Sequence, residues 1–220
     1  MNPVAKRTLT GLLVGALAIC AILFTPAAAA MPVIGALAAL AIAEYAMLLK
    51  KKEGLSKAVF AAMLVLGAAA IAGGFTMLAM TVKTHGNAML LYVIAIVKFS
   101  DVGGFAFGLS SAKLMKGGNH KMCPAISPNK SWEGMAGSVF ASCLVSCCFM
   151  PVTGFGLVKA LAFGVAAATV GTAGDLVESK FKRWVGVKDS SAMKCTNGMG
   201  GFLDMFDSLL FAPAALYSFI

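Results

Sequence analysis

The sequence contains few charged residues for its length, and this scarcity decides the class of protein. Only 12% of its 220 residues are charged, whereas 60% are hydrophobic. Soluble domains carry about 25% charged and about 45–50% apolar residues, so a water-soluble globular fold is excluded. A hydrocarbon core roughly 30 Å thick needs about 20 apolar residues for each helix that crosses it. We therefore expect an all-α fold, a polytopic bundle of transmembrane helices that forms a single membrane domain over residues 1–220.

Two further absences argue against zinc and nucleic acid as ligands. The six cysteines include no CxxC pair, and no cysteine and histidine have the spacing of a zinc site. We interpret the cysteines as small apolar filler. The net charge of +9 does not indicate nucleic-acid binding, because the basic residues lie between apolar segments and not along one amphipathic face.

Seven hydrophobic segments are present, and we interpret each as a membrane span. They cover roughly residues 9–28, 30–49, 58–81, 88–109, 134–152, 155–176 and 201–220. The first is expected to be a retained span, because its apolar stretch is longer than the roughly 7–15 residues of a cleavable signal peptide. Basic residues gather before the first span and after the second, fourth and sixth. The positive-inside rule therefore predicts a cytoplasmic N-terminus, with the long polar loops in the cytosol.

Acidic residues are scarce as well, and most of them occupy costly positions. Six of the nine lie in or beside the apolar segments: Glu44, Asp101, Asp175, Glu178, Asp204 and Asp207. An acidic residue at the centre of a membrane helix costs about 2.5–3.5 kcal/mol, so we expect these groups to face a polar cavity and to be paired with cations. Asp204 and Asp207 are three residues apart and share a helical face, as do Asp175 and Glu178. Carboxylates, completed by water and substrate phosphates, are the typical ligands of a magnesium site.

Two polar segments, "SPNKSWEG" and "KFKRWVGVKD", supply the opposite charge, and we interpret both as loops between spans. Their candidate phosphate-binding residues are Ser127, Lys130, Ser131, Lys182, Arg183 and Lys188. The first segment precedes a helix, whose free backbone N–H groups can also bind an anion. Basic groups beside magnesium-binding carboxylates predict phosphoryl or nucleotidyl transfer. The alternative interpretations are that the lysines only set the topology, and that Asp101 forms a structural ion pair with Lys98.

The order of these motifs resembles the phosphatidate cytidylyltransferase family, also called CDP-diacylglycerol synthases. The stretch "GDLVESKFKRWVGVKDSS", followed by "GMGGFLDMFDS", is similar to the family's C-terminal signature. That signature reads S-x-x-K-R, four residues, K-D-S, and then H-G-G-x-x-D-R-x-D. Upstream, "ISPNKSWEG" is similar to the motif S-P-x-K-[ST]-W-E-G, and "KFSDVGGFAFG" to an aspartate-bearing helix before it. The matching blocks lie between Lys98 and Ser208.

The resemblance implies a homodimeric inner-membrane enzyme whose active site faces the cytosol. It implies condensation of CTP with phosphatidic acid to give CDP-diacylglycerol and pyrophosphate, with Mg²⁺ bound by Asp175, Asp204 and Asp207. The catalytic set that it implies is Asp175, Lys188, Asp189, Asp204 and Asp207. It further implies phosphate binding by Ser127, Lys130, Ser131, Lys182 and Arg183, with Asp101 and Glu178 in supporting roles.

Three departures from the signature leave two other functions open. Met199 stands in place of the histidine, Met205 in place of the arginine, and two additional residues separate Asp189 from the glycine pair. Methionine neither transfers a proton nor holds a phosphate charge. A phosphate monoester, with a second pKa of about 6, is already anionic near neutral pH and attacks without a base; Lys194 is a candidate replacement for the arginine. The alternatives are a CTP-dependent lipid-alcohol kinase on the same fold and a non-catalytic phosphatidate-binding membrane protein.

Overall fold

A computed structural model describes residues 22, 24–115, 118–187 and 202–219. Its elements are α2 (Ala27–Lys50), α3 (Lys57–His85), α4 (Asn87–Leu114), β1 (Lys121–Cys123), β2 (Ser127–Ser131), α5 (Trp132–Cys148), α6 (Met150–Thr153), α7 (Leu157–Val185) and α8 (Phe202–Tyr217). The fold is mostly helical, as expected. The all-α expectation missed one feature, the antiparallel hairpin of β1 and β2. This hairpin includes the "SPNKS" segment that the sequence suggested as a loop.

Four of the described helices are long and apolar enough to cross a membrane. These are α2, α3, α4 and α7, and they confirm the expectation of an integral membrane protein with apolar helical spans. The fifth and seventh expected spans correspond to the shorter apolar helices α5 and α8. Most of the first expected span, residues 9–28, lies outside the described residues. Seven spans therefore remain a prediction.

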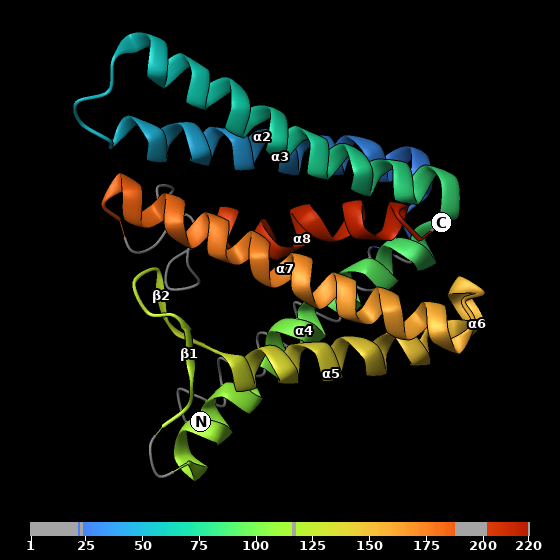
Figure 1. The fold of residues 1–220 in the computed structure, drawn as a ribbon. Coiled ribbons are helices and arrows are strands. Elements are labelled where there is room, and N and C mark those ends of the chain that lie inside the picture. Colours follow the sequence, from blue (N-terminus) through green and yellow to red (C-terminus); the bar gives the residue numbers. More distant parts are fainter. Residues whose placement is uncertain (1–21, 23, 116–117, 188–201, 220) are drawn as a thin grey trace, which may run out of the picture.

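The helices pack so that α8 lies in the middle of the assembly. α2 and α3 form an antiparallel pair on one side, and α8 runs between this pair and α7 (Figure 1). α4 crosses obliquely and packs closely against α5, which in turn packs against α7. Side chains from these helices form the buried core, among them Leu48, Phe75, Tyr92, Phe163 and Leu216.

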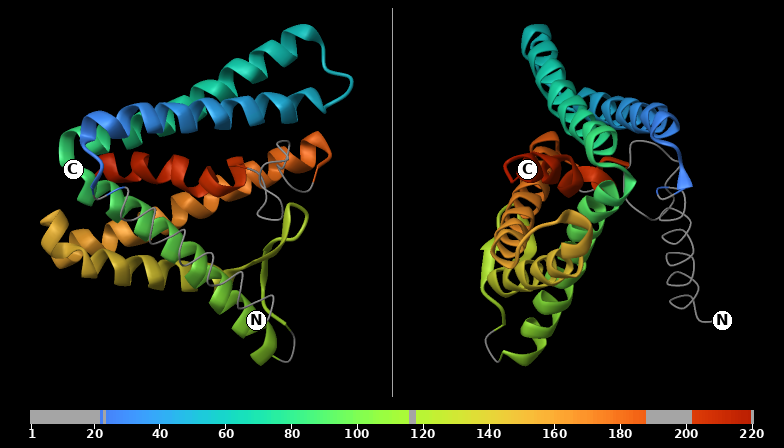
Figure 2. Two further views of the ribbon diagram at one scale, coloured as in Figure 1. Left: turned by 180° about the vertical axis from the view of Figure 1, so that it is seen from behind. Right: turned by 90° about the vertical axis from the view of Figure 1, so that its right-hand side faces the viewer.

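Polar segments that are distant in the sequence meet at one end of the helices. The α2–α3 loop, the β1–β2 hairpin and the C-terminal end of α7 lie at this end, and α8 begins on the same side (Figures 1 and 2). The α3–α4 turn, α6 and the C-terminal end of α8 lie at the opposite end. The connectivity thus gathers the motifs of the sequence on one side of the molecule.

Glycines allow α4 and α5 to approach each other closely. A Cβ atom added to Gly103 would lie 2.6 Å from the Cβ of Ala141, and one added to Gly137 would lie 2.6 Å from the carbonyl oxygen of Gly103. Beside this contact, the hydroxyl of Ser138 donates to the carbonyl oxygen of Ser100 at 2.9 Å. The close approach fixes the middle of α4, which carries Asp101, against the first half of α5.

α7 extends nine residues beyond the end of its expected span, so Lys182 and Arg183 belong to a helix and not to a loop as predicted. The helix continues past the apolar segment because its polar residues pair along one face: Lys182 binds Glu178 four residues earlier at 3.0 Å. It ends at Gly186, whose φ of 89° places it in the left-handed conformation that favours glycine. This extension carries Lys182 to Asp204 on α8.

Candidate functional site

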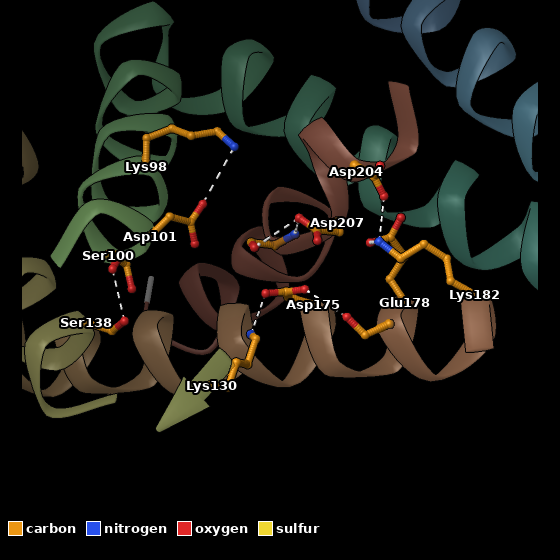
Figure 3. A network of polar contacts seen from close by, with 12 residues as sticks. Lys98, Ser100, Asp101, Lys130, Ser138, Asp175, Glu178, Lys182, Asp204 and Asp207 are labelled. Carbon is orange, nitrogen blue, oxygen red and sulfur yellow. Dashed lines mark hydrogen bonds and ion pairs between the residues drawn. The ribbon is translucent and has the colours of Figure 1, made fainter. Parts of the chain in front are cut away.

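A polar cavity of about 510 Å³ opens where α4, the hairpin, α5, α7 and α8 meet. Most of the residues predicted from the sequence line it: Asp101, Ser127, Lys130, Ser131, Asp175, Lys182, Asp204 and Asp207. They come from four separate elements, α4, β2, α7 and α8, yet Figure 3 shows acidic and basic members of the set directed toward one another. The structure thus brings together the two halves of the predicted site, the carboxylates and the cations.

α7 contributes a charged face to this site. Asp175, Glu178 and Lys182 are spaced by three and four residues, which places them along one side of the helix. Lys182 is largely buried, with 12% of its side chain exposed, and it bonds to two carboxylates at once: Glu178 at 3.0 Å and Asp204 at 2.6 Å. Two anionic partners offset the cost of removing a lysine charge from water.

The β1–β2 hairpin brings the second lysine. Lys130, on β2, forms an ion pair with Asp175 (Figure 3). The next residue, Ser131, caps α5 by accepting a hydrogen bond from the backbone N–H of Gly134 at 3.1 Å. This cap ties the strand to the helix, so that the position of Lys130 depends on the first turn of α5.

A second contact, between His120 and Glu133, attaches the segment before the hairpin to the first turn of α5. The ring Nδ1 of His120 lies 2.6 Å from Glu133 Oε1, and the backbone N–H of His120 also donates to the same carboxylate. The hydrogen bond with the His120 ring lowers the pKa of Glu133 to about 2. Glu133 therefore stays ionised, and it links the segment before β1 to the start of α5.

α8 places its two aspartates differently. Asp204 is bound to Lys182, whereas Asp207 accepts the backbone N–H of Ser208 at 2.5 Å and its hydroxyl at 3.1 Å. On α4, Asp101 lies 3.7 Å from Lys98, so the ion pair weighed from the sequence is present. Asp101 also lines the polar cavity, and its predicted supporting role stays a prediction.

Three carboxylates form a group whose chemistry fits a divalent cation. One oxygen each of Asp175, Glu178 and Asp207 lies within 4.8 Å of the other two. Glu178 Oε1 is buried and meets no hydrogen-bond donor among the described residues. Carboxylate oxygens are the ligands that Mg²⁺ takes in proteins, and a cation there would satisfy the orphan oxygen. Two predicted metal ligands, Asp175 and Asp207, are in this group; the third, Asp204, is instead drawn to Lys182.

Some predicted residues lie away from this cavity or outside the described residues. Arg183 is exposed and donates to the carbonyl oxygen of Ile126 at 3.5 Å. It is not one of the described residues that line the cavity. Lys188 and Asp189 lie outside the described residues, as do Lys194 and Met199. Their predicted roles stay predictions.

The sequence argument expected Glu44 to face a polar cavity and pair with a cation, but Glu44 is not among the described residues that line the polar cavity and lies instead against the first turn of α8. Glu44 is on α2, is fully buried, and accepts a hydrogen bond from the backbone N–H of Leu203 at 2.6 Å. Backbone N–H groups in the first turn of a helix lack partners within the helix, so this carboxylate supplies one for α8. The signal for such a role was an acidic residue alone in the apolar run "ALAIAEYAML".

Comparison with known proteins gives phosphatidate cytidylyltransferases among the relatives. The chain is 40% identical over 131 residues to a phosphatidate cytidylyltransferase of Staphylococcus aureus (strain COL), which covers 59% of this chain and 47% of the relative. It is 36% identical over 169 residues to a phosphatidate cytidylyltransferase of Staphylococcus saprophyticus, covering 76% of this chain and 60% of the relative. The chain therefore spans about half the length of the curated relatives it matches.

A family model shows the same relationship over a larger part of the chain. The model described as the cytidylyltransferase family matches residues 52–220, which include α3 to α8 and every residue of the polar cavity. Glu44 lies before the matched region. The match covers well over half of the sequence, and we conclude that the chain belongs to the cytidylyltransferase family.

Proposed function

We propose that this protein transfers CMP from CTP to phosphatidic acid and produces CDP-diacylglycerol and pyrophosphate for phospholipid synthesis. The observation that carries the proposal is the polar cavity, in which Lys130 and Lys182 meet Asp175, Asp204 and Asp207 beside apolar helices. Cations and clustered carboxylates at one place suit two anionic substrates, of which one is a lipid. The family and the names of the relatives support the same reaction.

The reaction needs positioning and charge stabilisation more than proton transfer. A phosphate oxygen of phosphatidic acid attacks the α-phosphorus of CTP and forms the new P–O–P bond. The bond from the α-phosphorus to the pyrophosphate breaks, and pyrophosphate leaves with the electron pair. Because the attacking phosphate is already anionic near neutral pH, no general base is required, and Met199 in place of a histidine is compatible with turnover. Lys130 and Lys182 would offset charge on the phosphates.

The carboxylates of α7 and α8 would hold Mg²⁺. Asp175, Glu178 and Asp207 are the group that lies close enough for one ion, and Asp204, also predicted as a ligand, would position Lys182 or join the ion when nucleotide enters. Bound Mg²⁺ supplies charge neutralisation on the phosphate oxygens of CTP. Lys188 and Asp189 are proposed to contact substrate from the segment that follows α7.

The orientation follows from the distribution of lysine and arginine. Among the described residues, most lysines and arginines belong to the end with the α2–α3 loop and the hairpin. Lys83, in the last turn of α3, and Lys159, in the first turn of α7, belong to the opposite end. By the positive-inside rule we place the first end, and the polar cavity, at the cytosolic face of an inner membrane. The homodimer that the resemblance implies is part of this proposal.

A labelling assay separates this function from its alternatives. The purified full chain is incubated with phosphatidic acid, Mg²⁺ and CTP labelled at either the α- or the γ-phosphorus. We expect label from α-CTP, and none from γ-CTP, in the lipid product, and loss of product when EDTA removes the metal. γ-Label in the lipid would indicate a lipid kinase. Phosphatidate binding without any CTP turnover across magnesium concentrations would indicate the non-catalytic protein.

A further inference from the structure

A second hollow lies on the other side of the carboxylate group, and its lining is almost entirely apolar. It has a volume of about 480 Å³, within the roughly 300–1,000 Å³ of small-molecule sites, and lies between α3, α7 and α8. We call it the apolar groove and define it by Gly73, Met77, Val177, Phe181, Leu210 and Phe211.

The groove exists because of small residues on α3. A Cβ atom added to Gly74 would lie 2.7 Å from the carbonyl oxygen of Leu210, so α3 and α8 are in close contact there. A Cβ atom added to the neighbouring Gly73 would meet no atom within 4 Å. The hollow therefore lies beside a fixed helix contact, and a side chain at position 73 would enter it without displacing the backbone.

The apolar groove reaches the polar cavity through shared residues. Asp207 lines both hollows, and Glu178, which lines the groove, belongs to the same carboxylate group as Asp175. The walls on α3 and α7 are parts of helices long and apolar enough to span a membrane. A molecule that occupied both hollows would need an anionic or metal-bound head and a hydrocarbon body.

We propose that the apolar groove binds an acyl chain of the lipid substrate, so that the lipid's phosphate is presented to the polar cavity beside Asp207. The inference rests on the proposed function. A hydrocarbon chain buries apolar surface without bringing polar groups, whereas a protein segment would bring backbone N–H and C=O groups that also need partners. The carboxylates at the inner end, with a metal ion, suit a phosphate head and do not suit an apolar helix of a second copy.

The variant Gly73→Leu tests the groove, and Gly35→Leu is its matched control. Gly35 is also a helical glycine in a candidate span, its added Cβ meets nothing within 4 Å, and it lies on α2 away from the groove. For Gly73→Leu we expect the KM for dioleoyl phosphatidate to rise about tenfold, the effect of uncovering about two methylene groups. The KM for CTP and the kcat should stay unchanged. Equal behaviour of the two variants would overturn the proposal.

A second measurement does not depend on turnover. Phosphatidate with a photoactivatable diazirine in one acyl chain is bound to the full chain and irradiated, and the labelled peptides are identified by mass spectrometry. We expect label at Met77 and Phe211 that unlabelled phosphatidate removes, that phosphatidylcholine does not remove, and that Gly73→Leu reduces. Gly35→Leu should keep the label.

The outcomes separate the groove from the function. Specific groove label without CDP-diacylglycerol formation would support the groove and overturn the transfer reaction. Turnover without groove label would overturn the groove and leave the reaction standing. If Gly73→Leu instead converts a dimer to a monomer, as measured by light scattering, and groove label is absent, a second copy is the occupant and the lipid proposal is wrong.

Discussion

At the scale of single residues, Asp204 and Asp207 differ in partner although they are one helical turn apart. Asp204 neutralises Lys182, while Asp207 belongs to the three-carboxylate group and lines both hollows. The spacing of three predicted that the two aspartates share a helical face. It could not predict which groups each aspartate would contact, because those contacts depend on how α7 packs against α8. Charge at both positions is nevertheless required by the proposed reaction.

We predict that Asp207→Asn and Asp204→Asn each lower kcat by at least about 100-fold, the scale of removing one transition-state charge contact. The amide keeps the shape of the carboxylate but neither binds Mg²⁺ as strongly nor balances Lys182. The α-labelled CTP assay measures the loss, and the yield of monodisperse protein from membranes checks that folding is retained. Near-normal turnover of Asp207→Asn would contradict the metal assignment.

Lys51→Ala, in contrast to the aspartate variants, is expected to leave turnover almost unchanged. Lys51 is exposed in the α2–α3 loop, and we assign its charge to topology. We expect kcat and both KM values within about twofold of the parent, because an isolated exposed charge contributes little to a structure. A large loss in the same assay would show that this loop contacts substrate.

Glu44 allows a separate test of how α8 is held. We predict that Glu44→Leu lowers the free energy of unfolding by about 1–3 kcal/mol, because the Leu203 N–H would be buried without an acceptor. Glu44→Gln keeps an oxygen acceptor and should remain close to the parent. Thermal unfolding in detergent, followed with and without Mg²⁺, measures both variants. Equal stability of Leu and Gln variants would show that the bond to Leu203 does not hold the helix.

At the scale of elements, the extended α7 and the hairpin decide the site. The apolar pattern predicted where spans occur, and α3, α4 and α7 begin within two residues of the expected positions. The pattern could not show that α7 continues to Val185, because a helix end beyond the membrane depends on side-chain pairs and a glycine cap. Nor could it show that "SPNKS" is a strand, since a short hairpin is stabilised by the helices beside it.

The close contact of α4 and α5 predicts sensitivity to small added volume. Gly137→Ala should lower stability by about 1–3 kcal/mol, because its Cβ would overlap the side chain of Phe107 and the carbonyl oxygen of Gly103. Gly35→Ala, which meets open space, is the control and should not destabilise. The thermal unfolding midpoint of each purified variant gives the comparison. An unchanged midpoint for Gly137→Ala would mean that the two helices can separate at no cost.

At the scale of the whole molecule, the arrangement of elements supports the topology inferred from charge. The α2–α3 loop, the hairpin that follows α4 and the C-terminal end of α7 lie at the same end, the arrangement expected when the chain alternates in direction from one apolar segment to the next. The charge pattern could predict this alternation, because each apolar segment reverses the direction of the chain. It could not predict that α8 lies in the middle of the helices, between the α2–α3 pair and α7.

Thiol labelling measures the orientation directly. In a cysteine-free background, Lys51→Cys and Lys83→Cys each place one exposed thiol at opposite ends of the molecule. We expect a membrane-impermeant maleimide to label Lys51→Cys in inside-out vesicles and Lys83→Cys in right-side-out vesicles. The reverse pattern would place the polar cavity outside the cytosol, away from CTP, and would contradict the proposed function.

By itself, the sequence determined that this protein is a membrane protein of apolar helices with acidic and basic motifs typical of cytidylyltransferases. Composition and motif order are properties of the linear sequence, so they can be read without knowing the tertiary structure. Only the tertiary structure decided that Lys182 bridges Glu178 and Asp204, that Glu44 supports α8, and that an apolar groove adjoins Asp207. These features arise from contacts between helices far apart in the chain, whose directions are set by close packing and not by periodicity.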